Sequence, residues 1–83
     1  MGAKEEIINV INFLEELKED TSIPKNIKEK IGTIIEILKD KEDVSINVNK
    51  ALHEFDEIAD DPNLQSYTRM QIWNVVSMLE KIK

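Results

Sequence analysis

The chain has no cysteine and few residues that break regular structure or carry specialised chemistry. Its 83 residues include two Gly, two Pro and single copies of Trp, Tyr, Arg and His. The lack of cysteine excludes disulfide bonds, thiolate catalysis and Cys-based metal sites. No apolar run approaches the roughly 18 residues of a membrane span, and the first ten residues lack a basic region followed by an apolar run. We therefore expect a cytoplasmic protein with no membrane partner.

Positive charge is also scarce, because the chain has 17 acidic and 11 basic residues and therefore a net charge of −6. Sequence-independent binding of DNA or RNA needs clustered Lys and Arg that neutralise phosphates. Many lysines lie three or four residues from an acid, as on a solvated helix surface. A nucleic-acid partner is therefore not expected, and the one local basic patch it could use consists of Lys25, Lys28 and Lys30.

Apolar residues recur at helical spacing in four segments, and no strand-like alternation competes with them. Pro24 suits the first turn of the second helix, and Asp43 or Ser45 suits the cap of the third. Connections this short place successive helices antiparallel. The sequence predicts one all-α domain over residues 1–83, a four-helix bundle with antiparallel neighbours. The expected helices cover about residues 3–18, 24–40, 45–60 and 65–82.

A shift of 41 residues aligns the apolar positions of the first half with those of the second, across the loop as well as the helices. Aligned pairs include Ile7 and Val48, Leu14 and Phe55, Asp20 and Asp61, Ile23 and Leu64, and Ile31 and Ile72. Such persistence is a sign of two copies of one helical hairpin. The alternative is that two hairpins of similar length look alike in any bundle.

Residues 60–76 hold the only Arg, Trp and Tyr of the chain. On a helical wheel, Trp73 lies about 120° from the centre of the apolar face, and Met70 lies almost opposite that centre. Arg69 precedes Trp73 by one turn, so its guanidinium can lie along the indole. It can also pair with one of three nearby acids, Asp56, Asp60 or Asp61.

Two interpretations of this cluster stay open. We favour a structural lock, in which the Asp61-Pro62-Asn63 turn sets the angle between the last two helices and Trp73 packs at a corner. Under the 41-residue shift Trp73 corresponds to Gly32, so the large side chain could fill the space beside the glycine. The alternative is a recognition surface, since Trp, Tyr, Arg and Met are enriched at interfaces. A small-molecule site is a third interpretation.

Other apolar residues lie outside the core faces and would support self-association if they shared one surface. They are Ile8, Phe13, Ile37 and Ile46. The candidates for the lock or the interaction surface are Asp61, Pro62, Asn63, Arg69, Met70 and Trp73.

His53 and Glu57 are the weak metal candidates, because they lie four residues apart on one helical face. Di-metal carboxylate bundles need Glu-x-x-His on two helices, but here position 50 is Lys and no second His exists. HExxH also fails, because position 57 is Glu. The serines suit caps or surface positions, and no glycine-rich phosphate loop is present. We therefore predict no enzyme activity, no catalytic residue and no cofactor.

Two segments, "EDTSIPKNIKEKI" and "LHEFDEIADDPNLQSYTRMQIWNVVSMLE", resemble a small archaeal family of uncharacterised proteins of about this length. The family signature runs through Asp61-Pro62-Asn63, Arg69, Ile72-Trp73-Asn74 and Leu79-Glu80. Gln65 and Tyr67 depart from it, since Pro and His are typical there, which puts any site at position 67 in doubt. The resemblance implies a compact four-helix bundle and no particular activity.

We therefore predict a non-enzymatic interaction or scaffold protein that binds a protein partner or a second copy of itself. The alternative is a small-ligand or metal-binding helical module that uses His53, Glu57 and Arg69.

Overall fold

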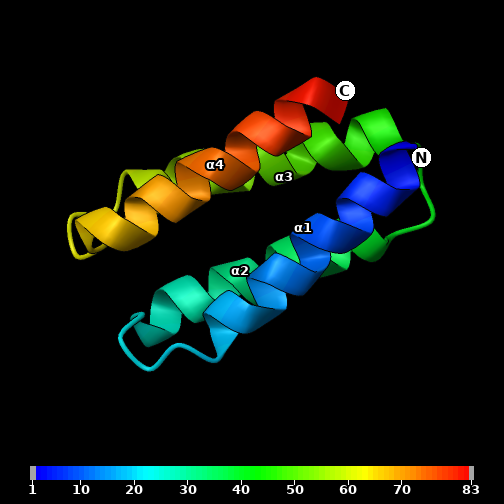
Figure 1. Ribbon diagram of the computed structural model, residues 1–83. Helices are drawn as coiled ribbons and strands as arrows, with labels where there is room; N and C mark the ends of the chain where they lie inside the picture. The colour runs from blue at the N-terminus through cyan, green and yellow to red at the C-terminus, as the bar shows by residue number, and fades with distance from the viewer. Residues whose placement is uncertain (1, 83) are drawn as a thin grey trace.

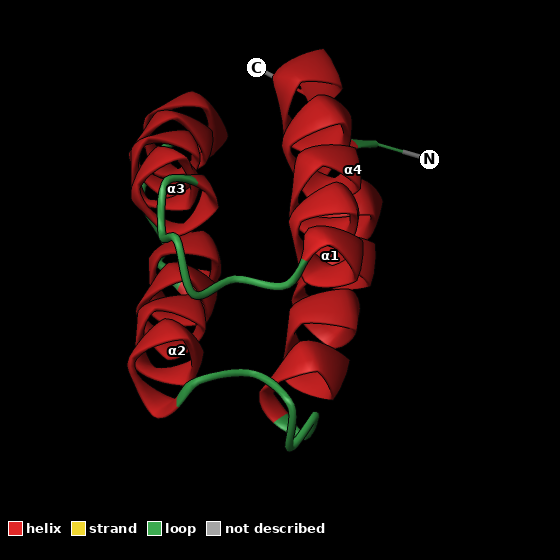
Figure 2. Cartoon of the chain, turned by 90° about the vertical axis from the view of Figure 1, so that its left-hand side faces the viewer, coloured by secondary structure: helices red, strands yellow, loops and turns green. Residues whose placement is uncertain are grey.

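The computed structural model describes residues 2–82, and the side chains of all of these except residue 3. The chain forms four helices, α1 (Ala3–Lys18), α2 (Lys25–Lys39), α3 (Val44–Ala59) and α4 (Ser66–Ile82), and residues 2–82 contain no strand. Successive helices are antiparallel, and α1 and α4 form one layer while α2 and α3 form the other (Figures 1 and 2). The predicted all-α four-helix bundle is confirmed, and each helix end lies within one residue of its expected position. None of the described helices is long and apolar enough to span a membrane.

The core consists mainly of pairs of residues 41 positions apart, both of them buried. These pairs are Ile7 and Val48, Val10 and Ala51, Leu14 and Phe55, Leu17 and Ile58, Ile23 and Leu64, Ile27 and Thr68, Ile31 and Ile72, Ile34 and Val75, Ile35 and Val76, and Leu38 and Leu79. The helix bounds repeat as well, since a shift of 41 residues carries α1 onto α3 and the start of α2 onto the start of α4. The bundle is therefore built from two copies of one hairpin design.

The two loops at one end of the bundle also repeat one turn (Figure 2). In the first loop, Oδ1 of Asp20 accepts a hydrogen bond from the backbone N–H of Ser22 at 2.9 Å. In the second, Oδ1 of Asp61 accepts one from the N–H of Asn63 at 2.8 Å. Such side-chain bonds to the backbone two residues on are typical of Asp at turns. Asn26 of α2 donates to Oδ2 of Asp61 at 3.4 Å, which joins the two hairpins at this end.

The helix starts differ in detail from the sequence prediction. Pro24 occupies the cap position just before α2 rather than its first turn, with φ −56° and ψ 147°. This extended conformation is compatible with the fixed φ of proline. In the loop before α2, the hydroxyl of Ser22 donates to Oδ1 of Asp20 at 2.7 Å. That hydrogen bond is the main reason why the pKa of Asp20 is lowered. Asp43 caps α3 by accepting from the N–H of Ser45 at 2.8 Å.

Candidate functional site

Arg69 reaches from the first turn of α4 to the C-terminal end of α3. Its Nε donates to the carbonyl oxygen of Ala59 at 3.2 Å, and its Nη2 donates to that of Asp61 at 2.9 Å. The last carbonyls of a helix lack intrahelical partners and carry partial negative charge, so a half-buried guanidinium stabilises them. Both acceptors are backbone carbonyls, whereas the sequence suggested a carboxylate. Arg69 thus holds the start of α4 against the end of α3, beside the Asp61 turn in which Pro62 and Asn63 are exposed.

Trp73 and Met70 are exposed, and the two hydrogen bonds of Arg69 go to the backbone of Ala59 and Asp61 instead. The expected match between Trp73 and Gly32 is wrong. A Cβ placed on Gly32 would lie 3.6 Å from Nζ and 3.9 Å from Cε of Lys18, and no other side chain that the structure describes comes as near. Under the repeat, Lys18 corresponds to Ala59 and Gly32 corresponds to Trp73. The first half therefore has the large residue at the end of its first helix and the small one in its second helix, and the second half has the reverse.

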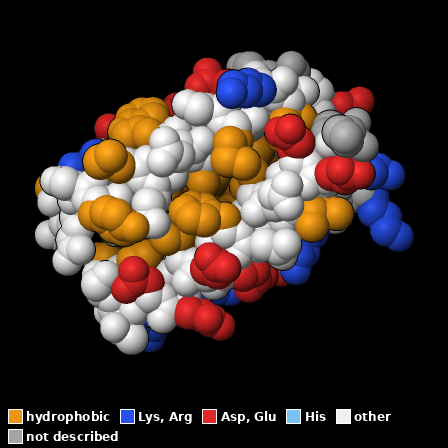
Figure 3. All heavy atoms as spheres, viewed as in Figure 1, with side chains coloured by type: hydrophobic (Ala, Val, Ile, Leu, Met, Phe, Trp, Pro, Cys, Tyr) orange, Lys and Arg blue, Asp and Glu red, His pale blue; other side chains and the backbone are white. Residues whose placement is uncertain are grey.

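The outward side of α4 is uncharged from Ser66 to Met78 and carries large apolar side chains. Tyr67 is 69% exposed, Met70 66%, Trp73 47% and Met78 37%. Between Ser66 and Leu79 the only charged residue is Arg69, although 34% of the whole chain is charged. We call this surface the α4 face and define it by Tyr67, Met70, Trp73, Asn74, Ser77 and Met78. Figure 3 shows apolar side chains gathered over α4 and along its border with α1, with acidic side chains on the α1 side.

A groove of about 300 Å³ runs along the border between α4 and α1. Phe13 is the α1 residue that lines it, and it also packs against the core. The lining residues from α4 are Tyr67, Met70, Gln71, Asn74, Val75 and Met78, so none of the described residues that line the groove is charged. An apolar floor with a few uncharged polar groups at its rim suits an apolar side chain of another molecule.

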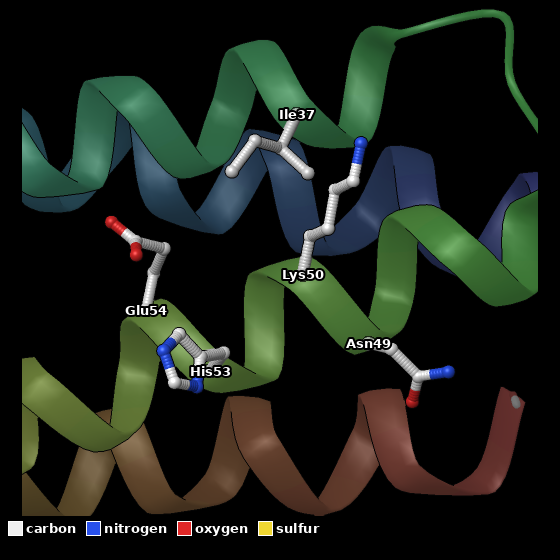
Figure 4. Close-up of a pocket in the computed structure, with 5 residues that line it drawn as sticks. All are labelled: Ile37, Asn49, Lys50, His53 and Glu54. Carbon is white, nitrogen blue, oxygen red and sulfur yellow. The ribbon is translucent and has the colours of Figure 1, made fainter.

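The repeat supplies an internal comparison, because the border between α2 and α3 is the counterpart of the border between α4 and α1. A shallow groove there is lined by Ile37, Asn49, Lys50, His53 and Glu54. Ile37 corresponds to Met78, but Glu54 corresponds to Phe13 and Lys50 to Asn9. Lys50 and Glu54 extend toward α2, while Asn49 points away from them (Figure 4). Of two equivalent grooves, one is therefore charged and the other is not.

Charged positions of α2 are likewise replaced by uncharged residues at the corresponding positions of α4. The charged residues of α2 at 25, 29, 30 and 36 correspond to Ser66, Met70, Gln71 and Ser77 of α4. Lys28 corresponds to Arg69, so within this stretch α4 keeps a charge only where Arg69 holds the end of α3. Because α2 shows that the bundle tolerates charge at these positions, packing alone does not require an uncharged α4 face.

The metal candidates are not brought together with other ligands. His53 and Glu57 are both exposed. Among the residues whose side chains the structure describes, no three His, Cys, Asp or Glu form a group that could hold a metal ion. His53 lines the shallow groove beside α2, and Glu57 does not.

Comparison with known proteins identifies the family. The model of the Uncharacterised protein family (UPF0147) matches residues 1–82. The chain belongs to UPF0147. It is 41% identical over 81 residues to the UPF0147 protein MJ1419 of Methanocaldococcus jannaschii, covering 95% of this chain and 87% of that protein. It is 38% identical over 86 residues to the UPF0147 protein PYRAB16980 of Pyrococcus abyssi, covering both chains fully.

A solved structure supports the same relationship. The crystal structure of the unknown function protein MMP1188 superposes with a TM-score of 0.88 at 35% sequence identity, covering 94% of this chain and 90% of that chain. The resemblance to an uncharacterised archaeal family is thereby confirmed. The UPF0147 signature read from the sequence divides into two parts in this chain. Asp61 and Arg69 fix the end of α3, and Trp73 lies on the exposed side of α4.

The candidates chosen from the sequence did not include Tyr67 and Met78, which belong to the α4 face. The groove that they share with Phe13 was also missed. The signal that could have found them is the repeat itself, because aligning α4 with α2 shows where charged positions become uncharged.

Proposed function

We propose that this UPF0147 protein is a non-enzymatic interaction protein that binds another protein chain through the α4 face. The observation that carries the proposal is the uncharged, apolar exposed side of α4 in a chain that is one-third charged. Interface cores are depleted in Lys, Glu and Asp and enriched in Tyr, Trp, Met and Arg. Monomer surfaces rarely keep large contiguous apolar patches without such a use.

The contacts of Arg69 support this function by fixing the helix that carries the surface. Its hydrogen bonds to Ala59 and Asp61 hold the first turn of α4 against α3. Buried residues such as Ile72 and Leu79 anchor the rest of α4 from the opposite side. A rigid helix loses little conformational entropy when it binds, so more of its contact energy appears as affinity.

The repeat provides the variant that tests this function. Met70 corresponds to Glu29, so Met70→Glu gives α4 the charge that α2 already carries on its exposed side. The matched control is Thr33→Glu, which adds the same charge to the exposed side of α2. We expect Met70→Glu to lower the assembly mass measured by sedimentation, or to release proteins that the wild type retains from an extract of its source cells. Thr33→Glu should behave like the wild type.

Both variants alter exposed positions, so their melting temperatures by circular dichroism should stay close to that of the wild type. The proposal is wrong if Met70→Glu keeps both the assembly mass and the retained proteins of the wild type at equal concentration.

A further inference from the structure

We propose that the partner at the α4 face is a second copy of this chain, and that the two α4 helices pack antiparallel across a two-fold axis at Asn74. This inference rests on the proposed function, because it names the occupant of the same face. It is carried by the spacing of the exposed residues, by their pairing across a two-fold axis and by the charge of the chain.

The exposed side of α4 has the spacing of a helix-pairing seam. Alternating steps of three and four residues connect Tyr67, Met70, Asn74, Ser77 and Lys81, all of them exposed. This is the pattern with which one helix presents a continuous edge to another. The core residues of α4 lie on the opposite side of the helix and pack into the bundle. The outward side therefore presents a separate seam to another molecule.

A two-fold axis at position 74 makes this seam complementary to itself. Such an axis places Met70 level with the partner's Met78, an apolar side chain against another, and one residue along the seam from the partner's Ser77. It places Tyr67 beside the partner's Lys81, where the phenol oxygen can accept from the ammonium group. Asn74 meets the partner's Asn74, and an amide can donate to and accept from its own copy. A single polar pair of this kind in a helix seam fixes the register of association.

The charge distribution favours a second copy over a partner attracted by charge. Each copy carries a net charge of −6, so contact through most other faces brings acidic side chains together. Like charges opposed across an interface cost several kcal/mol. The α4 face carries no acid, so no carboxylates oppose one another within the seam itself. The remaining long-range repulsion is screened by salt, so association of two copies should strengthen as ionic strength rises. Binding of a basic partner should weaken instead.

The seam is short, which sets the concentration at which association appears. From Tyr67 to Lys81 it spans about 21 Å at 1.5 Å per residue. One helix pair of this length buries an area at the low end of specific interfaces, roughly 1,200 Å² or less in total. We therefore expect a dissociation constant in the micromolar range, so measurements should extend to about 1 mM.

Engineered cysteines test the axis directly, because the chain has no cysteine of its own. Asn74→Cys should form a disulfide-linked dimer under mild oxidation. Thr33→Cys, at the corresponding position of α2, is the matched control and should cross-link at least tenfold more slowly. In Met70→Cys alone, position 70 of one copy lies about 12 Å along the seam from position 70 of the other copy. This is beyond the roughly 7 Å that a disulfide spans, so this variant should not cross-link to itself. A mixture of Met70→Cys and Ser77→Cys should cross-link.

Two results would overturn the inference. In the first, Asn74→Cys cross-links no faster than Thr33→Cys, and the wild type sediments as a monomer at all salt concentrations. In the second, Met70→Cys cross-links to itself as fast as Asn74→Cys, which would mean a parallel arrangement.

The two proposals can fail separately. If cross-linking fails but Met70→Glu still releases a bound protein, the second copy is wrong and the α4 face remains the interaction surface. If cross-linking fails and Met70→Glu also changes nothing, both proposals are wrong.

Discussion

Replacing Arg69 by Ala removes the two hydrogen bonds that join α4 to the end of α3. The bonds measure 3.2 Å to the carbonyl of Ala59 and 2.9 Å to that of Asp61. A hydrogen bond from a charged group contributes about 1.5–3 kcal/mol when it is well shielded from water. Arg69 is half-buried, so water can reach the carbonyls after truncation and the lower end of that range applies to each bond. We expect Arg69→Ala to lower the free energy of unfolding by about 2–3 kcal/mol.

Urea unfolding followed by far-UV circular dichroism measures this loss. Arg69→Lys keeps the charge but lacks the planar fork that reaches two carbonyls, so it should fall between the wild type and Arg69→Ala. The matched control is Lys28→Ala at the corresponding position of α2. There the cation acts on Asp20 only as a minor charge interaction, so its removal should cost clearly less.

The reasoning would be refuted if the free energy of unfolding of Arg69→Ala lay within about 0.5 kcal/mol of the wild-type value, the usual range for a plain surface substitution. Equal losses for Arg69→Ala and Lys28→Ala would refute it as well. Either result would mean that the carbonyls of α3 are as well satisfied by water as by the guanidinium.

Two further predictions concern places where the halves of the repeat differ. Asn47 is buried and its Nδ2 donates to the carbonyls of Asp40 at 2.9 Å and Glu42 at 3.4 Å. Asn47→Ala should therefore cost about 1–2 kcal/mol in urea unfolding, whereas the exposed Asn49→Ala should stay within about 0.5 kcal/mol of the wild type. Gly32 lies inside α2, and an added Cβ would meet only the flexible end of Lys18 at an ordinary contact distance of 3.6 Å. Gly32→Ala should raise the free energy of unfolding by about 0.5–1 kcal/mol, and a lower melting temperature would contradict this.

The fold could be predicted from the sequence because a bundle of short helices is specified by local signals. Helical spacing of apolar residues gave the four helices, and short connections gave their antiparallel order. The 41-residue repeat was also visible, since the aligned residues, such as Leu14 and Phe55, fill equivalent places in the core. Residue type limited the cap of α3 to Asp43 or Ser45, and the structure shows that Asp43 is the cap.

Contacts between elements were harder to predict, for identifiable reasons. The acceptors of Arg69 are backbone carbonyls, which every residue carries, so the sequence does not mark which ones it reaches. Trp73 and Gly32 correspond under the repeat, but correspondence places residues at related positions in separate hairpins and does not bring them into contact. The exposure of Trp73 was not predictable either, because a position about 120° from the core centre is covered or open depending on how closely the neighbouring helix approaches.

Methyl NMR of the wild-type protein labelled at methionine is the most direct test of the α4 face. Met70 and Met78 are two of the three methionines in the chain, and both lie on this face. In a dilution series from about 1 mM, a range that covers micromolar and weaker affinities, both methyl signals should shift with protein concentration. They should shift more at high salt, and in Met70→Glu the Met78 signal should stay at its dilute position. Concentration-independent Met70 and Met78 signals at every salt concentration would contradict self-association through α4.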